Sequence, residues 1–183
     1  SIKRDSGYGT ASGSLEYSHP LGGGWGLFAG GEARARGYPG ETDFNSLYGD
    51  VRAGAALNHG PTQWRFVGGY QAFNQDGAYT GEPMITNDRR TAYGQGDWKL
   101  MLDTKTQVGL GLQYSQVRFP TNEVEDFNQI YLQGSWLRSF ETKGVPLLYV
   151  SAFVSDDSAV NNIPGTDIDK SKNLFGMRGY GQY

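Results

Sequence analysis

The chain has 183 residues, a net charge of −3 and no cysteine. The length suits one domain, and the charge gives no basic field of the kind that nucleic-acid binding requires. Disulfides and cysteine-ligated metals are excluded, and no apolar run approaches the roughly 20 residues of a membrane-spanning helix. Glycine is frequent (28 residues), and no segment has a helical hydrophobic period. We therefore expect one all-β domain over residues 1–183.

Nine segments alternate between apolar and polar residues, with the two-residue period of a β-strand. Each is close to the roughly 9–11 residues that a tilted membrane strand needs. We expect an antiparallel up-and-down sheet from this succession. In chain order the segments cover residues 8–17, 25–35, 47–57, 64–72, 91–103, 108–114, 130–136, 148–154 and 175–183.

One set of alternating positions is free of charge, and the opposite set carries the mid-strand charges. A charge in contact with lipid costs about 2–4 kcal/mol near the bilayer midplane, so a membrane barrel requires such an uncharged face. The opposite face would then line the barrel lumen, either plugging it by ion pairing or selecting solutes by charge. The expected lumen-lining residues are Glu32, Arg34, Arg36, Asp50, Arg52, Arg65, Tyr93, Asp97, Lys99 and Arg178.

Short and long connections alternate along the expected strands. The short connections fall at residues 21–24, 58–61, 103–105 and 141–144, and the long ones at 38–45, 74–90, 118–128 and 156–173. Tight turns at one end and long loops at the other are typical of the periplasmic and outer ends of an outer-membrane barrel.

The four tryptophans all fall on the apolar positions, near the short connections. Trp is favoured at a membrane interface, where its ring is buried and its N–H contacts water. We expect an interfacial girdle formed by Trp25, Trp64, Trp98 and Trp136.

These features predict an antiparallel up-and-down transmembrane β-barrel whose apolar, Gly- and Ala-rich face contacts lipid. Lipid chains fill the space around small residues, whereas a soluble core needs side-chain volume to reach native packing density. The alternative is a soluble antiparallel β-sandwich or calycin-like binding module, in which the same face is the core. Nine is an odd number and bacterial single-chain barrels have even strand counts. We therefore expect the C-terminal portion of a longer chain and of a larger, even-stranded barrel.

Several stretches resemble the C-terminal barrel domains of tetratricopeptide-containing bacterial outer-membrane proteins. They are Phe44–Asp50, Gly68–Gly77, Gly96–Leu100 and the tail Asn173–Tyr183, which alternates and ends on an aromatic residue. The families concerned are exopolysaccharide-export porins, phage adsorption protein A and surface lipoprotein assembly modifiers. The resemblance implies an outer-membrane pore, export channel or anchor, with lipid, lipopolysaccharide, the barrel-assembly machinery and envelope complexes as partners.

We expect no enzyme activity, no cofactor and no metal. His19 and His59 lie at expected short turns, away from the outer end where membrane-barrel hydrolases place their triads. The loop acids Glu123, Glu125, Asp126, Asp156, Asp157, Asp167 and Asp169 offer oxygen ligands for calcium. The simpler interpretations are solvated loops, or carboxylates bridged by divalent ions to lipopolysaccharide. Passage of polysaccharide is suggested by tyrosines beside polar groups on the lumen positions, namely Tyr48, Tyr93, Tyr131, Tyr149 and Tyr180.

Overall fold

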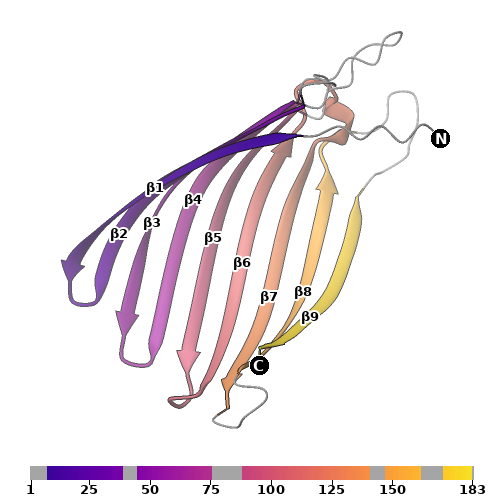
Figure 1. Cartoon of the computed structure of the whole chain (residues 1–183). Helices are drawn as coiled ribbons and strands as arrows, with labels where there is room; N and C mark the ends of the chain where they lie inside the picture. Colours follow the sequence, from indigo (N-terminus) through magenta and orange to yellow (C-terminus); the bar gives the residue numbers. More distant parts are fainter. Residues whose placement is uncertain (1–7, 39–44, 76–87, 141–146, 162–170, 183) are drawn as a thin grey trace.

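The computed structural model describes residues 8–38, 45–75, 88–140, 147–161 and 171–182. It confirms the all-β prediction: nine antiparallel strands form one sheet in chain order, as Figure 1 shows. Among these residues, the helical structure consists of one 3-10 turn, η2. The strands are β1 (Gly9–Gly22), β2 (Trp25–Gly37), β3 (Ser46–His59), β4 (Thr62–Gln75), β5 (Arg89–Met101), β6 (Thr106–Arg118), β7 (Phe127–Ser139), β8 (Leu147–Ala159) and β9 (Lys172–Gln182), with η2 at Glu123–Glu125.

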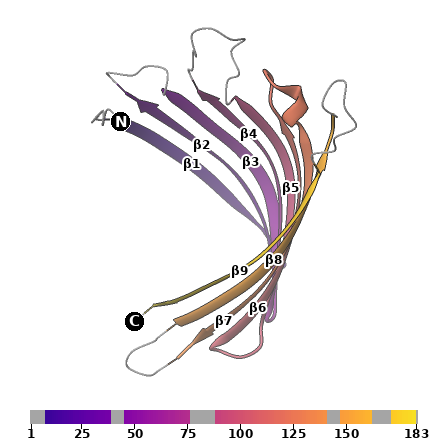
Figure 2. The same cartoon turned by 90° about the vertical axis from the view of Figure 1, so that its right-hand side faces the viewer.

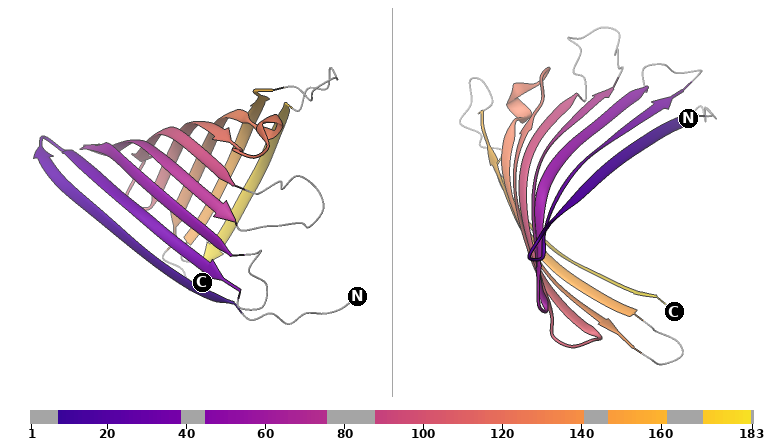
Figure 3. Two further views of the ribbon diagram at one scale, coloured as in Figure 1. Left: turned by 90° about the horizontal axis from the view of Figure 1, so that it is seen from above. Right: turned by 90° about the vertical axis from the view of Figure 1, so that its left-hand side faces the viewer.

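The sheet is a single curved layer. Figures 2 and 3 show it curling so that its two edge strands, β1 and β9, approach the same side without meeting. The strand order runs from β1 to β9 with no pairing between these two edges, so the described strands do not close into a barrel. In the described segments, no helix is long and apolar enough to cross a membrane.

Glycine sets the tight turn between β1 and β2. Gly23 and Gly24 connect the strands and have φ values of 61° and 85°. A two-residue hairpin turn with positive φ at both positions matches the twist of the flanking strands, and glycine adopts it without strain. A similarly short turn at Gly60–Pro61 connects β3 to β4, where Gly60 has a φ of 55°.

The strands extend further than the sequence pattern predicts. β1 continues through His19 and Pro20 to Gly22, and its pairing with β2 shifts register between Pro20 and Gly22. Proline is tolerated there because β1 is an edge strand and the ladder is already interrupted. β8 likewise continues to Ala159, so Asp156 and Asp157 belong to a strand and not to a loop.

The segregation of connection lengths is only partly observed. The connections Gly23–Gly24, Gly60–Pro61 and Leu102–Lys105 are short, and Phe119–Asp126 is longer. Between β7 and β8, however, the strands end at Ser139 and resume at Leu147, which is more than the expected four-residue turn. Most of the other expected long loops, and the expected turn at 141–144, lie outside the described residues.

Candidate functional site

The register places all ten expected lumen-lining residues on one face of the sheet, called here the polar face. Directly paired residues in an antiparallel sheet point to the same side. Glu32 pairs with Asp50 and Arg65 with Asp97, so their side chains share a face. The ladders carry this parity from β5 to β9, because Arg178 pairs with Ser151, which pairs with Ser135 and then with Gly109 and Lys99. The opposite side is called the apolar face.

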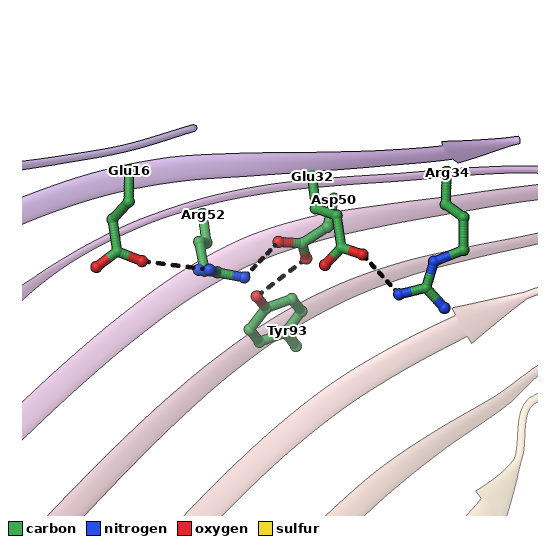
Figure 4. Close-up of polar contacts among 6 residues, drawn as sticks. All are labelled: Glu16, Glu32, Arg34, Asp50, Arg52 and Tyr93. Atoms are coloured by element: carbon green, nitrogen blue, oxygen red, sulfur yellow. Dashed lines mark hydrogen bonds and ion pairs between the residues drawn. The ribbon is translucent and has the colours of Figure 1, made fainter. Parts of the chain in front are cut away.

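A chain of polar contacts crosses the first five strands on the polar face (Figure 4). Arg52 on β3 contacts Glu16 on β1 at 3.3 Å and Asp50 at 3.1 Å. The hydroxyl of Tyr93 on β5 donates to Asp50 Oδ2 at 3.3 Å. Asp50 is only 4% exposed, and its carboxylate is therefore satisfied by a cation and a phenol in place of water.

A separate ion pair lies beside this chain of contacts. Arg34 Nη2 contacts Glu32 Oε1 at 2.8 Å on the same strand, β2. Side-chain exposures of 53% for Arg34 and 29% for Glu32 leave this pair in contact with solvent. It therefore contributes less to stability than the contacts of the buried Asp50.

Glycines lie beneath large side chains on the polar face. A Cβ added to Gly69 would lie 2.5 Å from the Tyr93 hydroxyl oxygen, and one added to Gly54 would lie 2.6 Å from Phe28 Cζ. Gly176 is covered by Phe153 in the same way. Side chains on this face thus lean across neighbouring strands and occupy the space above small residues.

The apolar face is open by comparison. A Cβ added to Gly13, Gly49, Gly94 or Gly134 would meet nothing within 4 Å. Leu15 is 79% exposed and Phe175 89%. The buried strand residues instead belong to the polar face, with Thr106 at the start of β6 as the exception; they are Asp50, Val67, Thr91, Ser115, Val117, Ser151, Ser155 and Asp157. This crowding indicates that the polar face is concave and the apolar face convex.

Aromatic rings occupy the polar face of β7, β8 and β9. Tyr131 stacks on Phe153 with centroids 5.4 Å apart, and Tyr149 stacks on Tyr180 at 5.0 Å. Gln133 bridges the two groups, since its Nε2 donates to the Tyr149 hydroxyl at 3.0 Å and its Oε1 accepts from the Tyr131 hydroxyl at 3.2 Å. The surface therefore combines flat apolar rings with hydrogen-bonding groups.

The tryptophans lie on the apolar face toward the short-turn end of the sheet. Trp64 pairs directly with Trp98, and their ring centroids are 6.2 Å apart. Trp25 joins the same row because it pairs with Leu57, which pairs with Trp64. Trp136 pairs with Val108, two residues nearer the turns than Leu110, which pairs with Trp98.

The acids expected to offer a calcium site are dispersed. Asp126 accepts a hydrogen bond from the Phe119 N–H at 2.7 Å and lies 3.7 Å from Arg118 Nε. Asp157 accepts hydrogen bonds from Gln129 at 2.8 Å and Ser155 at 2.7 Å, and lies 3.7 Å from Lys172. Asp167 and Asp169 lie outside the described residues. Over the described ranges, no three acidic, histidine or cysteine side chains are grouped as a metal site requires.

The two histidines make no contacts of the kind that a catalytic group requires within the described residues. His19 lies within β1 and His59 ends β3, and both are exposed. In the part of the chain that the structure describes, no hydrogen bond or ion pair involves either imidazole. The structure thus supplies no base–nucleophile contact at these positions.

One carboxylate at the short-turn end has a shifted pKa. Asp103 Oδ1 accepts the N–H of Lys105 at 2.6 Å and that of Thr106 at 2.8 Å, in the turn between β5 and β6. The hydrogen bond from the Lys105 backbone is the largest cause that lowers the Asp103 pKa. The charged form is favoured because both donors bind it better than the neutral acid.

Sequence reasoning missed the contacts between strands that are two apart in the sheet. Glu16 carries no obvious partner on β1, and Gly30 separates it from Arg52 in the same register row. A glycine between two opposite charges on alternate strands is the available signal, but it becomes visible only once the register is known. The aromatic residues Phe28 and Phe153 on the polar face were also missed, although each lies between two apolar-face positions of its strand and alternation alone places it there.

Comparison with protein families finds no family that matches the chain, and comparison with curated proteins finds no match either.

Proposed function

We propose that the nine strands are part of an outer-membrane β-barrel that serves as a pore, an export channel or a membrane anchor, without catalytic activity. The observation that carries the proposal is the crowding of side chains on the polar face, which indicates that the face with the mid-strand charges is concave and the apolar face convex. The charges on the apolar face lie toward strand ends, at Arg90, Arg118, Arg138 and Asp156. A soluble closed barrel would place the apolar face inside, whereas a membrane barrel places it against lipid.

The exposed apolar face needs a covering. Val67 and Val117 are the only apolar side chains buried within the described residues, and both lie on the polar face. Each buried Å² of apolar surface contributes about 25 cal/mol, so nine strands of uncovered side chains represent a large unfavourable contact with water. Lipid acyl chains would remove that contact from water and fill the space around the small residues.

Strand length and the tryptophan row support the same placement. The strands contain 11–14 residues, enough for the about 9–11 that cross the hydrocarbon region and for a margin at each end. Trp64 and Trp98 would then mark the interface nearest the short turns. In bacterial barrels the short turns face the periplasm, so the short-turn end of this sheet would face the periplasm and the other end the cell exterior.

The two edges suggest how the sheet is completed. β1 and β9 run in the same direction, because an even number of antiparallel steps separates them. An odd number of further strands would pair antiparallel with both edges and give an even total. We assign these strands to additional polypeptide, with lipopolysaccharide and the barrel-assembly machinery as partners of the finished barrel. The alternating strand Lys172–Gln182 is the segment that the machinery would recognise.

The polar face supplies the transport hypothesis. Its contacts among Glu16, Arg52, Asp50 and Tyr93 would form part of the lumen wall. The stacked rings Tyr149 and Tyr180 suit sugar rings, which pack on aromatic faces while their hydroxyls bond to neighbouring polar groups. Polysaccharide is the export substrate that this surface favours.

The test is the electrophoretic mobility of the membrane-extracted protein in SDS, compared boiled and unboiled. We expect outer-membrane fractionation and a heat-dependent shift, because a closed barrel resists SDS until it is heated. A chain that is monomeric in buffer without detergent, lacks the shift and has blue-shifted Trp emission would instead establish a soluble β-sandwich or calycin-like module.

A further inference from the structure

A cavity of about 250 Å³ opens on the polar face near the short-turn end of β3, β4 and β5. Its lining includes Arg65 and Asp97, which are directly paired across β4 and β5 but contact different neighbours. The Arg65 guanidinium lies over the Phe28 ring, 4.6 Å from its centroid, on the β2 side. Asp97 leans toward β6, where a Cβ added to Gly111 would be 3.0 Å from Asp97 Oδ1.

At this cavity the carboxylate has a hydrogen-bond partner, whereas the two cationic residues have no carboxylate partner among the described residues. Gln95 Nε2 donates to both oxygens of Asp97 at 2.9 Å, so this carboxylate already has a partner. Arg65 and Lys99 line the cavity, and within the described ranges neither forms an ion pair with a carboxylate. Two exposed cationic residues therefore line the cavity beside one carboxylate that is already hydrogen-bonded.

The remaining lining consists of Ala56, Trp64 and two amide residues that add hydrogen-bond donors. Asn58 and Gln63 are directly paired on β3 and β4, and both amides lie at the cavity with Lys99 in the same register row. An arginine fork, an ammonium and two amides together match the oxygens of a carboxylate or a phosphate.

We propose that this cavity binds the oxyanion group of a solute, either a carboxylate or a phosphate. The inference deepens the proposed function, since it names a charged class of solute for the same lumen, but binding itself needs only the polar face. The anion would sit between Arg65 and Lys99 and accept hydrogen bonds from Asn58 and Gln63.

The polar face offers a continuation of the site along one row. From Lys99 the row passes Gly109, Ser135 and Ser151 to Arg178 on β9. Arg178 lies over the Phe153 ring, 5.3 Å from its centroid, and no carboxylate contacts it in the described parts of the chain. A solute with several oxyanions would thus meet a third cation, Arg178, beyond a row of small residues.

The test is an NMR titration of the full chain at low ionic strength, followed through the backbone amides of Gln63 and Lys99. The probes are inorganic phosphate, gluconate and the uncharged sorbitol, so that phosphate and carboxylate sources are compared against a matched neutral polyol. We expect saturable shifts with phosphate or gluconate and none with sorbitol. Arg65→Gln and Lys99→Gln should each weaken anion binding about tenfold or more, the loss expected for one charge-assisted hydrogen bond.

Two further variants make the result independent of misfolding. Asp97→Asn should tighten binding about threefold, because a like charge near the anion is removed. Arg34→Gln is the control, since it removes a polar-face arginine that already pairs with Glu32, and binding should not change. Absence of shifts in the intact chain, equal response to sorbitol, or unchanged affinity in both cation variants would overturn the proposal.

The same titration separates this inference from the proposed function. It is run in detergent if the protein fractionates with membranes and in plain buffer if it is soluble, because the cavity exists on the sheet in either case. Anion binding by a soluble chain would overturn the barrel and keep the site. A membrane barrel that binds no anion would keep the barrel and overturn the site.

Discussion

The two faces of the sheet share one backbone but differ in how closely their side chains pack. On the polar face a Cβ at Gly54 or Gly69 would collide with neighbouring rings, whereas at Gly94 and Gly134 on the apolar face it would meet open space. Curvature is the cause, because it draws side chains together on the concave side and spreads them on the convex side. The same residue type therefore has different roles on the two faces: glycine makes room for a neighbour on one and leaves a gap on the other.

The largest expected effect comes from placing a charge on the convex side. Leu110 is 50% exposed on the apolar face, and Gln113 lies on the polar face of the same strand. We expect Leu110→Lys to prevent membrane assembly, since a midplane lysine costs about 2–4 kcal/mol, and Gln113→Lys to assemble normally. The measurement is the yield of heat-modifiable protein in the outer-membrane fraction.

Val51 on β3 and Gln95 on β5 provide a second matched pair for this experiment, on the apolar and polar faces respectively. Equal tolerance at the two faces would contradict lipid contact. It would instead fit solvent on both sides, where an exposed substitution changes stability by about 0.5 kcal/mol or less.

A smaller effect should follow from filling space on each face with one methyl group. Gly54→Ala places a Cβ against the Phe66 carbonyl oxygen and 2.6 Å from Phe28 Cζ, so we expect a loss of about 1–3 kcal/mol in unfolding free energy. Gly94→Ala meets no neighbour within 4 Å and should gain about 0.5–1 kcal/mol, because alanine loses less backbone entropy in a strand. Urea unfolding of both variants measures the difference, and similar losses at both positions would disprove the asymmetry in crowding.

The smallest expected effect is the difference in unfolding free energy between a buried and an exposed carboxylate of the polar face. Asp50→Asn weakens contacts to Arg52 and Tyr93 at a 4% exposed residue, and we expect a loss of about 1–3 kcal/mol in unfolding free energy. Glu32→Gln removes a solvent-exposed pair with Arg34 and should cost less than about 1 kcal/mol. Urea titration gives both values, and the reverse order would show that burial does not govern this network.

Alternation along the sequence was sufficient to identify the strands and their faces. Alternation identifies the face because side chains two positions apart along a strand point to the same side, as do Ala92, Gly94, Gly96 and Trp98. The ends of strands were harder to locate. β1 runs through Pro20 because an edge strand tolerates a missing N–H. β8 continues through Asp156 and Asp157 because both pair with β7, where Gln129 also donates a hydrogen bond to Asp157.

The contacts that define the candidate site depend on register and curvature, which no single segment encodes. Glu16 and Arg52 lie on strands that are not neighbours, and they meet over Gly30 because the ladders align all three. The cavity likewise lies beside two directly paired residues that contact different strands. Arg65 lies over Phe28 on β2, and Asp97 lies near Gly111 on β6. The sequence could predict that these side chains share a face but not that they turn apart.

Glycines covered by aromatic rings also limit which amino-acid substitutions the protein tolerates during evolution. Gly69 and Tyr93 occupy one shared volume, as do Gly176 and Phe153. A larger residue at the glycine is compatible with the fold when the ring opposite becomes smaller, so these positions are expected to drift as coupled pairs. Positions such as Gly94 and Gly134 have no such neighbour and are free to vary one at a time. Descendants of this sequence should therefore record its curvature as covariation on one face and as independent variation on the other.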